Sequence, residues 1–262
     1  MSRIFRQKGR SRSAKRVNGL FIILKVTCIA AGAAVTRIII LQKAQNEDQS
    51  PLFLYYEDTM DIVRIDRYDD DRFSKTVLNQ HGAYLVDNEP YQIEITDSSS
   101  AVLHGKDPVV YETLIEEFRF HAPHIIKFYD ENSMLITEYS LPKLLDIPID
   151  SIQPSQFFVD EEKLKAVRSF IGKAEDIVVQ VKPYGDRFIS LDGHTRLYLA
   201  VQNGFGTVKA VESETDDWVW PFVHEAEKRN ILRPGDMILL PHDQYEIQWN
   251  QYCDKLFAGE NQ

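Results

Sequence analysis

Five consecutive residues, Asp192 to Arg196, carry the groups that could hold a phosphate. They lie in the stretch ISLDGHTRLYLA, where an apolar, β-branched run passes directly into a helical pattern. A helix that starts at the end of a strand has unpaired backbone N–H groups in its first turn, and these donors and the helix dipole attract anions. Gly193 would let the backbone approach a ligand closely.

The side chains of this run add further chemistry. Thr195 offers a hydroxyl donor, and Arg196 offers a planar fork that fits phosphate through two hydrogen bonds. His194 can donate a hydrogen bond or move a proton near neutral pH. Asp192 can act as a base toward a hydroxyl or hold Mg²⁺ beside a phosphate. The run therefore predicts a site for a phosphorylated small molecule.

A simpler interpretation of the same residues stays open. Asp192 could cap the helix, Gly193 and His194 could form the turn, and Arg196 could pair with one of the 40 acidic side chains. A motif this short does not separate the two interpretations without its structural context.

The elements around the run follow a β-α-β-β-α-β order over residues 142–213. A strand-like run leads through the turn QPSQ into a helical pattern with acids in its first turn and Gly172 near its end. Two strands then form a hairpin around YGD, the second helix closes on Gly204, and a last strand follows. This order predicts a mixed α/β (α+β) fold.

The sequence before this unit, residues 60–141, predicts a small α+β unit. Residues 82–104 contain two alternating runs separated by turn residues, which indicates antiparallel strands. Asp107 followed by proline is typical of a helix start, and Pro123 should end that helix. His121 and His124 lie at its end, and we interpret them as structural because no acidic partner stands at ligand spacing.

The tail, residues 216–262, has a mostly helical pattern and predicts a helical C-terminal extension. An aromatic stripe with helical spacing runs along it: Tyr245, Trp249, Tyr252 and Leu256. Such a stripe indicates a face that packs into the core rather than a ligand site.

Charge is distributed unevenly along the 262 residues. The net charge is −10, yet residues 1–45 contain ten Lys and Arg and no acid, which leaves 20 basic against 40 acidic side chains in residues 46–262. Such an acidic body repels phosphate backbones, which argues against nucleic-acid binding. Cys28 and Cys253 stand far apart, so we expect no disulfide and no metal site, and a cytoplasmic location.

The basic and apolar N-terminal segment, residues 1–50, is left out of the fold prediction. It could be an extension outside the fold, a membrane anchor or a cleaved targeting sequence. Membrane contact is expected only through residues 20–42. Lys25 and Arg37 interrupt that run, and the uncharged residues 26–36 are too few to span a bilayer about 30 Å thick.

The unit at about 142–215 resembles the ParB/sulfiredoxin-like superfamily. The resemblance is carried by DIPIDSIQPSQFFVDEEKLKAVRSFI and by ISLDGHTRLYLAVQNGFGTVKA, which place a phosphate-binding signature where a strand meets a helix. ParB-type members use CTP and sulfiredoxins use ATP. The version most similar to LDGHTR is that of the free L-serine kinases, which use ADP or ATP.

This resemblance implies roles for the same run. Asp192 would be the base toward a substrate hydroxyl, with His194 beside it as a catalytic residue. Gly193, His194, Thr195 and Arg196 would bind the phosphates of ATP, ADP or CTP with Mg²⁺. The chain would then be a nucleotide-dependent enzyme, transferring a phosphoryl group to an amino-acid-like hydroxyl.

Two departures from the family pattern keep a second function open. The signature contains no cysteine, which argues against sulfiredoxin chemistry. The serine kinases have a catalytic glutamate in the loop that corresponds to Ser155 and Gln156, and the neutral Gln156 cannot act as a base. Residues 155–156 are therefore a candidate substrate loop, and a regulatory or adaptor module that binds a nucleotide without turnover is the alternative function.

Overall fold

The alternating runs near residue 82 form the first sheet of the body. The computed structural model describes residues 60–215 and 217–258 in full, and nearer the N-terminus only the backbone of three strands. The six strands of this sheet follow chain order: β4 (Ile62–Arg64), β5 (Ala83–Val86), β6 (Glu89–Ile95), β7 (Ser100–His104), β8 (Lys127–Asp130) and β9 (Leu135–Glu138).

One crossover interrupts this antiparallel meander. β7 and β8 pair in parallel, and helix α2 (Tyr111–His121) lies between them in the chain. Asp107 caps a 3₁₀ turn before α2 by accepting a hydrogen bond from the backbone N–H of Val109 at 3.0 Å. The helix ends before Pro123, as predicted. A short helix that the sequence did not predict, α1 (Lys75–Asn79), begins at the capping hydroxyl of Ser74.

The second sheet carries the predicted β-α-β-β-α-β unit. Its spatial order is β10-β15-β13-β14-β11, and helices α3 (Glu161–Arg168) and α4 (His194–Gln202) connect its strands. The mixed α/β (α+β) fold is confirmed. The bounds of the five strands are β10 (Leu144–Pro148), β11 (Ile152–Pro154), β13 (Val178–Tyr184), β14 (Arg187–Ser190) and β15 (Thr207–Glu212).

The tail contains a strand that its helical pattern did not predict. β16 (Ile238–Leu240) pairs in parallel with β12 (Phe158–Asp160), the strand that leads into α3. Three residues are too few to show a strand period, which explains the omission. The rest of the tail is helical as expected: α5 (Trp220–Lys228), α6 (His242–Tyr245), a π-helical turn over Glu246–Asn250, and α7 (Gln251–Ala258).

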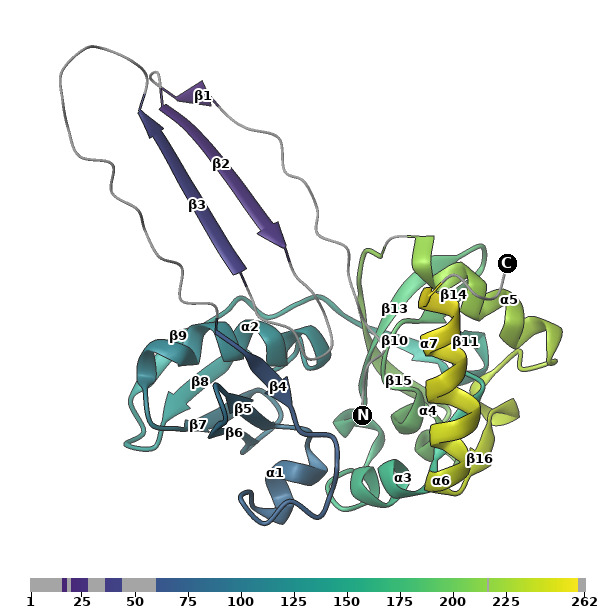
Figure 1. Cartoon of the computed structure of the whole chain (residues 1–262). Coiled ribbons are helices and arrows are strands. Elements are labelled where there is room, and N and C mark those ends of the chain that lie inside the picture. The colour runs from purple at the N-terminus through teal and green to yellow at the C-terminus, as the bar shows by residue number, and fades with distance from the viewer. Residues whose placement is uncertain (1–15, 18–19, 28–35, 44–59, 216, 259–262) are drawn as a thin grey trace.

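Four separate apolar clusters lie among the described residues, and the two largest hold most of these elements. The larger one runs from Ile147 to Cys253, so the residues on both sides of position 215 share one core. The predicted aromatic stripe packs into it, with Tyr245 and Trp249 each only 2% exposed. The smaller of these two lies between α2 and the first sheet. Figure 1 shows the two parts side by side, with α7 crossing in front of the second sheet.

The described part of the N-terminal segment is β-strand. β1 (Arg16–Val17), β2 (Leu20–Thr27) and β3 (Thr36–Lys43) form a sheet of their own, with β2 and β3 antiparallel. The other residues of the 1–50 segment, Cys28 among them, lie outside the described part of the chain. No helix in the described part is long and apolar enough to cross a membrane.

Candidate functional site

The strand-to-helix junction turns on Gly193. This residue is the N-cap of α4 and has a φ of +84°, a left-handed conformation that favours glycine. Asp192 does not cap the helix, because no side chain accepts a capping hydrogen bond there. The interpretation of Asp192 as an N-cap is therefore wrong: the turn at Gly193 leaves the first N–H groups of α4 without a side-chain acceptor.

Arg196 braces the junction from within. Its Nη2 donates to Asp192 Oδ2 at 2.9 Å and its Nη1 donates to the carbonyl oxygen of Val178 at 2.5 Å. The pairing of Arg196 with an acid, the simpler interpretation, is therefore present. It does not exclude phosphate binding, since a guanidinium has five N–H donors and only two are used in these bonds.

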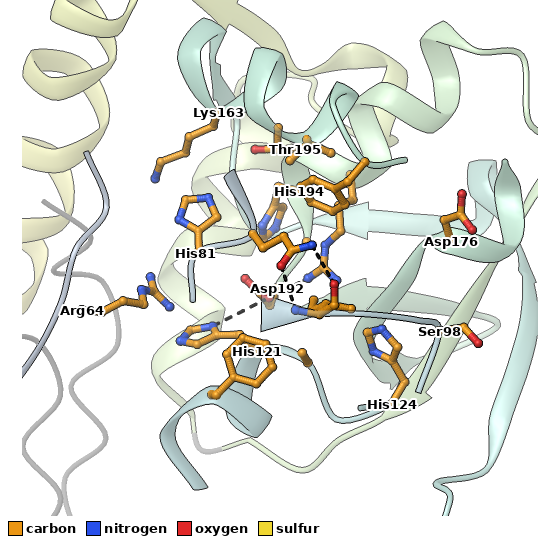
Figure 2. A pocket seen from close by; sticks show the side chains of 18 of the residues that line it. Arg64, His81, Ser98, His121, His124, Lys163, Asp176, Asp192, His194 and Thr195 are labelled. Carbon is orange, nitrogen blue, oxygen red and sulfur yellow. Dashed lines mark hydrogen bonds and ion pairs between the residues drawn. The ribbon is translucent and has the colours of Figure 1, made fainter. Parts of the chain in front are cut away.

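The junction opens into a cavity of about 490 Å³ between the two parts of the body. The five residues from Asp192 to Arg196 all line it, so the structure brings the predicted run to one place. The opposite wall comes from the first unit and from α3. Its polar and charged residues include Arg64, His81, His121, His124 and Lys163 (Figure 2).

His121 and His124, at and just after the end of α2, are functional candidates that their sequence pattern did not indicate. His121 is the last residue of α2, and its Nδ1 lies 3.9 Å from Asp192 Oδ2. His124 also lines the cavity, and its buried Nδ1 has no hydrogen-bond partner among the residues that the structure describes. The structural interpretation of both stays a prediction, which was made without knowledge of this placement. The one available signal was a pair of polar rings just after an apolar helix.

A series of polar contacts between side chains supports the cavity wall next to these histidines. Asp66, with 4% of its side chain exposed, pairs with Arg64 at 2.9 Å and lies 3.2 Å from His81 Nδ1. His81 Nε2 lies 3.1 Å from the hydroxyl of Tyr68. Both ring nitrogens of His81 are therefore engaged, which fixes this ring against the cavity.

Burial controls the charge of the site. Burial alone would raise the pKa of Asp192, but His121 and Arg196 hold it well below its usual value, so Asp192 is ionised. Burial lowers the pKa of His121, with a further contribution from Arg64 and against the pull of Asp192. Burial likewise lowers the pKa of His194 to about 4. Both imidazoles are therefore neutral at pH 7.

The predicted substrate loop is split between two environments. Ser155 is 5% exposed, its hydroxyl donates to the carbonyl oxygen of Ser190 at 2.7 Å, and its Oγ lies 3.1 Å from His194 Nε2. Ser155 does not line the cavity, and it holds the His194 ring through this contact. Gln156 lines the cavity, and its amide donates to the hydroxyl of Tyr245 at 3.3 Å.

Two groups in the cavity are available to a ligand. The Thr195 hydroxyl has no side-chain hydrogen bond, and the Lys163 ammonium has no ion pair, to any residue in the described ranges. Lys163 lies 5.3 Å from the ring centroid of Tyr245. A hydroxyl and an ammonium beside a helix N-terminus are suited to a phosphate group. No set of three or more His, Cys, Asp or Glu in the described residues could hold a metal ion.

Comparisons with known proteins do not assign this chain to a family. No family model and no curated protein matches it. Among solved structures, it is similar to protein Atu1540 from Agrobacterium tumefaciens, with 23% sequence identity and a TM-score of 0.25. That match covers 36% of this chain and 50% of the other, so it spans half of that protein's length. The ParB/sulfiredoxin-like resemblance stays a prediction.

Proposed function

We propose that the cavity binds a nucleotide and that the chain transfers a phosphoryl group from it to the hydroxyl of a small molecule. The observation that carries this proposal is the convergence of all five residues from Asp192 to Arg196 on one cavity whose other wall is rich in cationic and imidazole groups. A cavity of about 490 Å³ falls within the size range of small-molecule sites.

The phosphates would lie at the start of α4. The backbone N–H groups after Gly193 and the hydroxyl of Thr195 are donors, and the Lys163 ammonium supplies a compensating charge. The nucleotide would be ATP, ADP or CTP, and its Mg²⁺ would neutralise the charge that develops on the transferred group.

The acceptor hydroxyl would lie near Asp192. Phosphoryl transfer depends mainly on positioning and on charge stabilisation, so the chain has to fix the acceptor in line with the phosphorus atom and exclude competing water. Asp192 is ionised and held by Arg196, which makes its carboxylate a fixed acceptor. His121, the last residue of α2, lies beside this carboxylate.

Gln156 favours one alternative, a module that binds a nucleotide without turnover. It lines the cavity at the position where the resemblance expects a catalytic glutamate, and its amide is already bonded to Tyr245. An amide cannot accept a proton as a carboxylate can. If no other residue replaces that glutamate, binding without turnover follows.

Calorimetric titration of the full chain tests the proposed binding. We expect Mg·ATP, Mg·ADP or Mg·CTP to bind. Lys163→Ala should weaken that binding at least tenfold, since one charge-assisted contact is worth about 1.5–3 kcal/mol. Lys165→Ala is the matched control, because Lys165 is exposed on the same helix and does not line the cavity. No heat with any of the three nucleotides would contradict the proposal.

A turnover assay separates the enzyme from the binding module. Asp192→Asn should abolish phosphoryl transfer to L-serine or glycerol while leaving the nucleotide Kd within about threefold, because asparagine can still accept a hydrogen bond from Arg196. If the wild-type chain binds a nucleotide but transfers phosphate to no acceptor, the binding module is the correct function.

A further inference from the structure

His121 and Asp192 form a pair across the boundary between the two parts of the body. His121 ends α2, and its ring packs edge-on against Phe120 at a centroid distance of 4.9 Å. Its Nδ1 faces Asp192 Oδ2 from 3.9 Å, which is longer than a hydrogen bond and becomes an ion pair only when the ring is protonated. Figure 2 shows this pair in the cavity.

The position of the proton on His121 follows from its partner. An ionised carboxylate can only accept, so the nitrogen that faces Asp192 carries the hydrogen in the neutral ring. Nε2 is then the basic nitrogen. Within the described ranges Nε2 has no hydrogen-bond partner, and the side chain is 31% exposed in the cavity wall.

We propose that His121 is the general base of the phosphoryl transfer and that Asp192 is a positioning residue, which fixes the ring with Nε2 toward the acceptor hydroxyl. This inference rests on the proposed function and assigns to a residue of the first unit the proton transfer that the resemblance implies for Asp192. The arrangement follows the general logic of a base oriented by a third group.

Neither Asp192 nor Gln156 suits the role of base. Asp192 is bonded to Arg196, and a carboxylate whose pKa is well below its usual value holds a proton poorly. Gln156 is an amide. His121 is neutral at pH 7 because burial lowers its pKa, and a neutral imidazole can accept a proton.

The proton of the acceptor hydroxyl moves to Nε2 of His121, and an electron pair on the hydroxyl oxygen forms the new bond to the terminal phosphorus of the nucleotide. The bond from that phosphorus to the bridging oxygen breaks, and its electrons stay on the departing nucleotide. The imidazolium, stabilised by Asp192, then returns its proton to water.

Burial has the largest effect on the pKa of His121 and lowers it, and charged groups around the ring modify that shift. Asp192 favours the protonated ring, as does Asp66 from a greater distance, whereas Arg64 disfavours it. On its own helix, Glu117 lies one turn earlier, and burial raises the pKa of that carboxyl. Activity should therefore fall on the acidic side, with a midpoint below 6.5.

The first test requires no substrate. Long-range ¹H–¹⁵N NMR spectra of the ¹⁵N-labelled full chain at pH 7 should show His121 with a protonated Nδ1 and a bare Nε2, assigned by the signal lost in His121→Gln. Asp192→Ala should remove this tautomer preference. A protonated Nε2 in the wild type, or an unchanged tautomer in Asp192→Ala, would overturn the proposal.

The second test measures transfer from labelled ATP to L-serine or glycerol. His121→Gln should lower kcat at least about 100-fold, remove the acidic limb of the pH profile and leave the ATP Kd within about threefold. His104→Gln should change nothing, since the His104 side chain at the end of β7 is 42% exposed and does not line the cavity. Added imidazole should restore part of the activity of His121→Ala, which guards against a folding defect.

The two tests distinguish failure of the role of His121 from failure of the proposed phosphoryl transfer. If transfer occurs and His121→Gln keeps kcat within threefold, His121 is not the base and the proposed function stands. ATP binding without any transfer would overturn the role of His121 and leave a binding module. Failure to bind any nucleotide would overturn the proposed function itself.

Discussion

At Gly193 the chain turns from strand to helix in a conformation that only glycine adopts easily, and the space around it is closed. A Cβ atom added there would lie 2.7 Å from Val179 Cγ1 and 3.1 Å from the Arg196 guanidinium. The glycine therefore has two functions at once: it permits the positive φ, and it admits the arginine that holds Asp192.

Gly193→Ala tests this double requirement against a matched control. Gly204 also has a positive φ, +72°, but a Cβ there would meet nothing within 4 Å. We expect Gly204→Ala to cost about 1–2 kcal/mol of unfolding free energy, the cost of a left-handed non-glycine residue. Gly193→Ala should cost about 1–3 kcal/mol more because of overpacking.

Urea denaturation of both variants measures the difference, and calorimetry with Mg·ATP measures the effect on binding. Only Gly193→Ala should also weaken nucleotide binding, because only that substitution would shift the first turn of α4. Equal losses of stability in the two variants would show that the contacts of Gly193 with Val179 and Arg196 are unimportant.

At the scale of elements, the predictions succeeded where a local period was long enough to be recognised. The helix of residues 111–121 and the hairpin of β13 and β14 followed from capping residues and alternation. β12 and β16 were not predicted as a pair, because each is three residues long and their pairing joins distant parts of the chain. Short strands of this kind are defined by their partners rather than by their own sequence.

The aromatic stripe of the tail gives a test of how firmly this element belongs to the core. Trp249 is 2% exposed and packs against Phe157 at 4.8 Å and Phe222 at 5.8 Å between ring centroids. Trp249→Ala should destabilise the chain by about 3–5 kcal/mol, the usual cost of removing a buried aromatic side chain.

Ile247→Ala is the control for this substitution, because Ile247 belongs to the same π-helical turn and is 59% exposed. Its effect on the unfolding free energy should stay within about 0.5 kcal/mol. If chemical unfolding shows a similar small change for Trp249→Ala, the tail does not contribute to the core that it contacts in this structure.

At the scale of the whole molecule, the cavity exists because two parts of the chain meet. The amide of Asn79 donates to the Ser169 hydroxyl at 2.9 Å, and the amide of Gln180 donates to the carbonyl oxygen of Phe120. The second bond holds the end of α2, and with it His121, beside the junction.

The sequence could indicate the run from Asp192 to Arg196, whose chemistry is local. It could not indicate the opposite wall, since nothing near His121 in sequence shows which surface it faces.

Burial of several histidines in this arrangement makes the stability of the whole fold depend on pH. His194 is 7% exposed, and burial lowers its pKa to about 4, whereas in the unfolded chain it titrates near 6.5. The unfolded chain therefore binds more protons than the folded one between pH 6.5 and 4. Stability should be full above 6.5 and should fall with pH across that window, by about 1.4 kcal/mol per pH unit for each such group at most.

His242 should act in the opposite direction. Burial alone would lower its pKa, but the hydrogen bond to Asp160 at 2.8 Å raises it above the ordinary value. A raised pKa gives stability that is present below about 6.5 and is lost as the pH rises through the folded value. Substitution of each histidine should therefore change the dependence of stability on pH, in opposite directions for His194 and His242.

Urea unfolding of the full chain at a series of pH values from 8 to 4.5 measures both effects. His194→Gln should flatten the acid-side loss of stability relative to the wild type, because one proton-linked group is removed. His242→Gln should lower stability more at pH 5 than at pH 8, because the charge contribution to the pairing with Asp160 is present only when the ring is protonated. Parallel profiles in the two variants would contradict the burial of His194 and the pairing of His242 together.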